Sequence, residues 1–163
     1  MPRLALALSL LLATALPGAA SMLVGQASVI DSDVLDLDGQ RIMLYGLESV
    51  ERGKTCLIDG TAWDCYPAAV RQLETLVSEG PVECEQVGEP DRYRRILAYC
   101  RIGEKDLNEA FVASGFAVAR PDETDRFVAA EEAAKKAGLG LWQGKFLRPM
   151  DYRVSVGIMV DRP

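Results

Sequence analysis

Four carboxylates flank a predicted β-hairpin early in the sequence. Asp31 and Asp33 lie at the start of its first strand, and Glu48 and Glu51 follow its second strand. Apolar and polar residues alternate on both sides of Asp38-Gly39, a pair that tolerates the positive φ of a two-residue turn. Folding at this turn brings the carboxylates to one edge, where like charges require a cation or a proton. The pattern therefore predicts a metal site, and a solvated acidic rim is the alternative.

The sequence contains no histidine. Histidine-based catalytic triads, Cys-His catalysis and most catalytic zinc sites are therefore excluded. A general base must then be a carboxylate, Lys, Tyr or Cys, and a metal must be held by oxygen atoms. Oxygen ligands favour calcium or magnesium.

Residues 1–21 have the composition of a secretory signal peptide. A short basic start ending at Arg3 is followed by an apolar run over residues 4–16 and by small residues over 17–21. The run is too short for a membrane span, although an uncleaved anchor is the alternative, and no later segment is apolar enough to cross a bilayer. We therefore expect a secreted or periplasmic protein with no membrane span in the mature chain.

The chain is acidic overall. Its formal net charge is −6 at pH 7, and removal of residues 1–21, which contain one arginine, makes the mature charge one unit more negative. A sequence-independent nucleic-acid binder normally presents a basic face, so the net charge argues against that class. A local basic groove is still allowed.

Four cysteines in a small exported chain indicate two disulfides. Of the three pairings, we favour Cys56–Cys65, which closes a short loop, and Cys84–Cys100, which joins two predicted strands. Four buried thiols are disfavoured in an oxidising compartment. A zinc site is disfavoured because no Cys-x-x-Cys spacing occurs.

The remaining sequence predicts one domain with a hydrophobic core. We expect the domain to span residues 22–153, with residues 154–163 as a peripheral tail. Strands come first and helices come late, which favours an α+β fold containing a small β-barrel. Apolar spacing and helix-end signals predict three helices, at residues 67–78, 106–114 and 125–137.

Five ordered motifs carry a resemblance to a known family. They are Val29-Ile-Asp-Ser-Asp-Val-Leu35, Leu44-Tyr-Gly-Leu-Glu-Ser-Val-Glu51, Asp91-Arg-Tyr-Arg-Arg-Ile-Leu-Ala-Tyr99, Asp106-Leu-Asn108 and Gly140-Leu-Trp-Gln-Gly-Lys-Phe146. Their order and spacing resemble the staphylococcal nuclease-like (thermonuclease) family from about Gly25 to Arg153. Several motifs at consistent spacing are far more specific than any one of them.

The resemblance implies a fold and an activity. The implied fold is an OB-fold, a five-stranded Greek-key barrel with about three helices, whose face binds single-stranded nucleic acid. The implied activity is calcium-dependent hydrolysis of DNA and RNA phosphodiesters. Nucleic acid is then the expected partner and calcium the expected cofactor.

Several functional positions of the family are retained. Glu51 stands where the family has its general base, and Arg95 matches a phosphate-binding arginine. Asp33 keeps a metal-binding carboxylate of the family, and Asp31 keeps the acidic residue that the family places behind the metal ligands. A backbone carbonyl near Ser49 is a further expected metal ligand.

Four positions depart from the family pattern. Glu48 replaces a metal-binding Asp and adds a methylene, so calcium binding is expected to be weak. Met43 replaces a phosphate-binding arginine, Val34 lacks a hydroxyl, and Arg120 stands where the family often has a tyrosine.

Met43 has the largest expected effect because it can neither donate a hydrogen bond nor carry charge. Loss of one such donor slows an enzyme by roughly a hundred- to a thousandfold. Arg41 lies on the same strand face and could substitute, but the hairpin register sets it opposite Asp36, where a cross-strand ion pair is the alternative.

Two interpretations of the sequence follow. The first is an exported, metal-dependent nuclease with a partly degraded site and weak or lost activity, favoured by Asp33, Glu51 and Arg95. The second is a non-catalytic OB-fold module that binds a partner, favoured by the four departures and by the acidic charge.

The signal peptide predicts cleavage near Ala20 or Ser21, because small residues there suit a signal peptidase. Intact-mass measurement of the exported protein should give a new N-terminus at this position. Soluble exported protein that retains Met1 would contradict the prediction.

Overall fold

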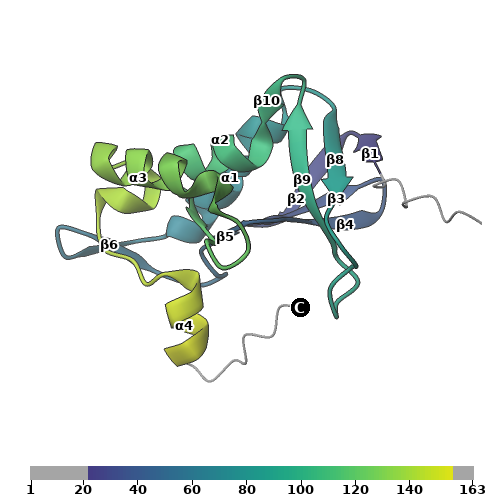
Figure 1. Ribbon diagram of the computed structural model, residues 1–163. Coiled ribbons are helices and arrows are strands. Elements are labelled where there is room, and N and C mark those ends of the chain that lie inside the picture. The colour runs from purple at the N-terminus through teal and green to yellow at the C-terminus, as the bar shows by residue number, and fades with distance from the viewer. Residues whose placement is uncertain (1–21, 156–163) are drawn as a thin grey trace, which may run out of the picture.

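The computed structural model describes residues 22–155, and the expected signal peptide lies outside them (Figure 1). Seven strands precede the first helix and most helices come late, in an α+β arrangement that includes two short 3-10 helices. The strands are β1 (Met22–Gly25), β2 (Ala27–Asp31), β3 (Val34–Leu37), β4 (Gln40–Leu44), β5 (Leu47–Ser49), β6 (Cys56–Ile58), β7 (Thr61–Trp63), β8 (Val82–Gln86), β9 (Ile96–Ile102), β10 (Lys105–Asp106) and β11 (Ala117–Ala119). The helices are α1 (Cys65–Val77), α2 (Leu107–Ala113), η1 (Asp125–Phe127), α3 (Val128–Ala137), η2 (Gly140–Gln143) and α4 (Pro149–Ser155).

The main sheet has the strand order β1-β8-β9-β4-β3-β2, with β10 paired to β9. The pairing of β4 with β9 is parallel, and the other pairings in this sheet are antiparallel. The predicted α+β class is confirmed. The barrel is not closed within residues 22–155, because the main sheet stays an open path and β5 and β11 pair with each other. Figure 1 shows α1, α2 and α3 grouped beside the sheet, with α4 apart from them.

The predicted hairpin is confirmed in β3 and β4. Asp38 and Gly39 both have positive φ, at 52° and 82°, as a two-residue turn requires. Asp36 lies opposite Arg41 in the register, as expected.

The first strand of the hairpin is shorter than the sequence predicted. The chain turns between β2 and β3, so that Asp31 ends one strand and Asp33 lies in the turn. Ser32 explains this turn: its N–H donates to Asp31 Oδ1 (2.9 Å), and its buried hydroxyl donates to the carbonyl of Val50 (2.8 Å). Such local hydrogen bonds compete with strand pairing.

The three predicted helices are confirmed, with small shifts. The first begins two residues early, at Cys65. Asp106 caps α2 by accepting from the N–H of Glu109 (2.9 Å), and Thr124 caps the short η1 that leads into α3. Helix α4 was not predicted, because its residues had been assigned to the end of the domain and the tail.

The core lies between the main sheet and the first three helices. Fully buried side chains from both sides form it: Leu35, Ile42, Leu44, Leu73, Phe111 and Phe127. The Gly-Leu-Trp motif closes it at one end, where Leu141 N–H donates to the carbonyl of Gly115 (2.9 Å). A Cβ on Gly140 would lie 2.5 Å from the carbonyl carbon of Gly115, so only glycine fits there.

Both predicted disulfides are present. Cys84 and Cys100 lie directly opposite each other on β8 and β9, and Cys56–Cys65 ties β6 to the start of α1. Within the described range, no helix is long and apolar enough to cross a membrane.

Removal of the disulfides should lower the free energy of unfolding. Replacing both cysteines of a pair by alanine should cost about 2–4 kcal/mol, with Cys56–Cys65 at the low end because it spans the shorter loop. Urea unfolding of the two double variants measures this. An unchanged midpoint in both would contradict a structural role.

Candidate functional site

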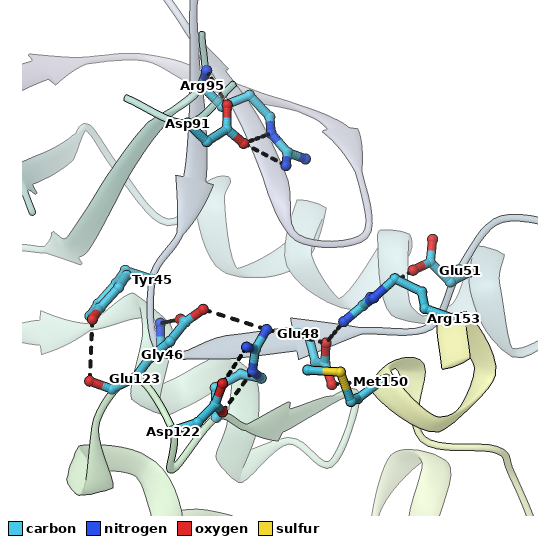
Figure 2. Close-up of polar contacts among 11 residues, drawn as sticks. Tyr45, Gly46, Glu48, Glu51, Asp91, Arg95, Asp122, Glu123, Met150 and Arg153 are labelled. Atoms are coloured by element: carbon cyan, nitrogen blue, oxygen red, sulfur yellow. Dashed lines mark hydrogen bonds and ion pairs between the residues drawn. The ribbon is translucent and has the colours of Figure 1, made fainter. Parts of the chain in front are cut away.

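Glu48 is a buried carboxylate at the centre of the candidate site (Figure 2). It lies on β5 opposite Val118 of β11, and only 2% of its surface is exposed. Its Oε1 accepts a hydrogen bond from the backbone N–H of Met150 (3.1 Å), and its Oε2 forms an ion pair with Arg153. A buried charge needs such partners, because desolvation disfavours it strongly.

Arg153 joins the two glutamates of the site. Its Nη2 binds Glu48 Oε2, and its Nη1 lies 2.8 Å from Glu51 Oε1. Helix α4 delivers the side chain, which is 14% exposed. Burial lowers the pKa of the Arg153 guanidinium, but its bonds to Glu48 and Glu51 outweigh burial and raise the pKa overall.

Arg120 provides a second guanidinium next to Glu48. It follows β11 and is buried, with Nη1 3.6 Å from Glu48 Oε2 and 3.4 Å from Glu123 Oε1. Its Nε and Nη2 bind Asp122. The hydrogen bond to Asp122 is the largest cause of its raised pKa. Arg120 is therefore surrounded by the carboxylates of Glu48, Asp122 and Glu123.

Gly46 fixes the segment that carries Arg120. Its N–H donates to Glu123 Oε2 (3.0 Å), and its carbonyl accepts from Arg120 N–H (2.9 Å). Gly46 has a φ of 80°, and a Cβ there would lie 2.5 Å from Thr124 Cγ2. Figure 2 shows Tyr45 next to Gly46 and Glu123, and the Tyr45 hydroxyl donates to the Glu123 carbonyl (3.2 Å).

Asp31 is held by a tyrosine that the sequence analysis did not single out. The hydroxyl of Tyr66, on α1, donates to Asp31 Oδ1 (2.9 Å). Burial and then this hydrogen bond raise the pKa of Tyr66 to about 12. Asp33 lies in the adjacent turn, where its carbonyl accepts from Leu44 N–H (3.0 Å).

Arg95 is engaged by Asp91, apart from the glutamates. Its Nε and Nη2 lie 2.7 and 2.6 Å from Asp91 Oδ2, and Figure 2 shows this pair separate from Glu48, Glu51 and Arg153. Burial would raise the pKa of Asp91, but hydrogen bonds from Arg95 and from the backbone lower it overall.

A surface depression of about 300 Å³ lies beside Arg95. Its lining includes Asp31, Val34, Arg41 and Arg95. Arg41 and Arg95 thus line the same depression as the retained acid Asp31. Arg41 is exposed here, as a substitute donor would have to be.

Met43 lies in a small apolar cluster. It is 2% exposed and packs with Val34 and Leu97, against which its strand is paired. Met43 and Val34 therefore pack against each other. This apolar contact occupies two positions at which the family has polar side chains.

The predicted metal residues do not fit a hard divalent cation in this arrangement. Residues 22–155 contain no group of three or more Asp, Glu, Cys or His side chains that could hold a metal. Glu48 and Glu51 are instead both ion-paired with Arg153. The Ser49 hydroxyl donates to the carbonyl of Phe116 (2.7 Å). The structure thus joins Glu48 to Glu51 through an arginine, and the hydrogen bond from the Ser32 hydroxyl to the carbonyl of Val50 holds the turn with Asp31 and Asp33 against this segment.

Arg153 is a residue of the candidate site that the sequence analysis did not predict. Its helix has a recognisable start, because Pro149 suits a first turn and Asp151 follows within that turn. The signal was available, but no sequence pattern indicates that this short helix contacts β5, about a hundred residues earlier.

Comparison with known proteins identifies relatives. The sequence profile described as staphylococcal nuclease homologue matches residues 42–144. The succinoglycan biosynthesis protein ExoI of Rhizobium meliloti (strain 1021) is 35% identical over 142 residues, covering 85% of this chain and 74% of that protein.

The Asp91–Arg95 pair predicts a pH-dependent contribution to stability. Asp91 has a pKa below its ordinary value of 3.8, so its contribution is full above that pH and is lost as the pH falls through the lowered pKa. Asp91→Asn should lower the free energy of unfolding at pH 7, and the difference from wild type should shrink in acid.

Urea unfolding at a series of pH values measures this difference. Glu83→Gln is the control, because Glu83 pairs with Arg101 in a partly exposed ion pair that contributes little. A wild-type advantage over Asp91→Asn that stays constant in acid would contradict the account.

Proposed function

Since the chain belongs to the staphylococcal nuclease family, we propose that it is an exported nuclease-like protein whose hydrolysis of nucleic-acid phosphodiesters is weak or lost. The observation that carries this proposal is the state of Glu48. Its carboxylate is ion-paired with Arg153 and accepts a hydrogen bond from the N–H of Met150, with Arg120 3.6 Å away, so it can ligate a metal only when Arg153 leaves it.

Phosphodiester hydrolysis needs a base, a neutralising cation and donors on the phosphate oxygens. Glu51 and Arg95 are the proposed base and donor, and both are ion-paired within the chain. Met43 supplies no donor. Each of these features lowers the rate, and together they favour slow hydrolysis over rapid turnover.

The proposed cofactor is calcium, bound weakly. Asp33, Glu48 and a backbone carbonyl near Ser49 are the proposed ligands, and calcium would supply positive charge next to the phosphate. Arg153 already supplies positive charge at Glu48, which explains why affinity would be low.

Single-stranded nucleic acid is the proposed ligand of the basic surface next to Arg95. Arg41 and Arg94 line a depression of about 360 Å³ together with Tyr93, which is 60% exposed. An exposed aromatic ring among arginines suits base stacking and phosphate contact. This local basic patch lies on an otherwise acidic chain.

Export rests on sequence and disulfides. Two disulfides are typical of proteins outside the cytoplasm, and residues 1–21 have the composition of a signal peptide. The proposed domain is residues 22–153, although α4 continues to Ser155.

A non-catalytic binding module is the second candidate function. The apolar packing of Met43 and the ion pairing of Glu48 favour it, since both remove groups that hydrolysis needs. The relative from Rhizobium meliloti is named for succinoglycan biosynthesis rather than for nuclease activity. A module that serves such a process would keep the fold and dispense with the reaction.

Restoring the missing donor separates the two candidates. Met43→Arg should raise cleavage of single-stranded DNA in calcium by roughly a hundred- to a thousandfold, and Glu51→Gln on that background should abolish the gain. Thermal melts must accompany the assay, because Met43 is buried.

Two outcomes would overturn the proposal. Rapid cleavage by wild type that Glu51→Gln stops would show an intact site with another donor. A folded Met43→Arg variant that stays silent, like wild type, would favour the binding module.

A further inference from the structure

The Glu48–Glu51 pair already contains a cation, and the cation belongs to the chain. The two Nη atoms of Arg153 contact one oxygen of each glutamate. Of the two glutamates, Glu48 is almost fully buried, whereas Glu51 is partly exposed. The guanidinium therefore reaches from the protein interior to the surface.

We propose that Arg153 replaces the divalent cation at this site, so that α4 supplies an intramolecular counter-ion and a metal can bind only when Arg153 is withdrawn. The proposal rests on the proposed function only in locating the site at Glu48 and Glu51. It requires no hydrolysis.

The chemistry of arginine suits this role. Its planar guanidinium stays protonated and presents separate donors to two carboxylates. A calcium ion would need several oxygen ligands, and the structure offers donors at Glu48 instead: the Met150 N–H on Oε1 and Arg153 Nη2 on Oε2. Arg120 adds a second positive charge 3.6 Å from Oε2. Guanidinium and metal are thus mutually exclusive occupants.

Helix α4 is held in place by contacts other than Arg153. Lys54 Nζ lies 3.4 Å from the ring centroid of Tyr152, and Pro149 is buried. Just before the helix, Arg148 pairs with Glu131 of α3 (2.6 Å). Removal of the Arg153 charge should therefore leave the helix docked while leaving Glu48 and Glu51 short of positive charge.

The test compares calcium binding by four full-length proteins: wild type, Arg153→Gln, Arg153→Lys and Arg126→Gln. Arg126→Gln is the matched control, since it removes the same charge from a half-exposed pair with Asp106. The readouts are titration calorimetry and thermal melts with calcium or with chelator. Because neither measures cleavage of nucleic acid, this inference and the nuclease proposal can fail separately.

Arg153→Gln should bind calcium about tenfold to a thousandfold more tightly than wild type, because one cation near two carboxylates is gone. Its melting temperature should fall in chelator and recover in calcium. For wild type, Arg153→Lys and Arg126→Gln, the melting temperature of each protein should be the same in calcium as in chelator. A folded Arg153→Gln with no gain in affinity, or a gain matched by Arg126→Gln, would overturn the proposal.

A measurement on wild type covers the case in which Arg153→Gln does not fold. The Nη protons of Arg153 should give separate, slowly exchanging NMR signals at neutral pH that persist in millimolar calcium. Averaged, rapidly exchanging signals, or their loss on adding calcium, would overturn the proposal equally.

Discussion

The charge of Glu48 is the constraint on which the site depends. A carboxylate this deeply buried must be compensated, and the chain does so with two guanidiniums and a backbone N–H. Arg120 comes from the end of β11, and Arg153 comes from α4. The segment after β11 and the helix after η2 therefore both contact β5, because each supplies positive charge to Glu48.

On the proposal that Arg153 replaces the metal, this compensation explains how a nuclease fold persists without a bound cation. In a metal-dependent enzyme the cation neutralises the acidic residues and also polarises the phosphate. An arginine can perform the first task while it stays bound to the glutamates. The replacement keeps the fold stable, and it removes the free coordination positions that chemistry would need.

The sequence predicted the elements whose signals are local. Asp38-Gly39 marked the hairpin turn, Thr124 and Asp106 marked helix starts, and the disulfide between Cys84 and Cys100 followed from two adjacent strand patterns. These features depend on neighbouring residues or on simple strand pairing, so a sequence reveals them.

The features that were missed depend on contacts between distant segments. The turn at Ser32 is stabilised by a bond to Val50, and the seven residues of α4 contact β5 through Arg153. Neither follows from local pattern, because a short helix gains its stability from docking rather than from its own residues. The sequence predicted a cation next to Glu48 and Glu51, and Arg153 supplies a positive charge there.

The most direct test of this account is a crystal structure of the wild-type protein grown in millimolar calcium. The account predicts that Arg153 lies between Glu48 and Glu51 with no calcium beside them. A calcium ion bound to Asp33 and Glu48, with Arg153 displaced, would contradict it.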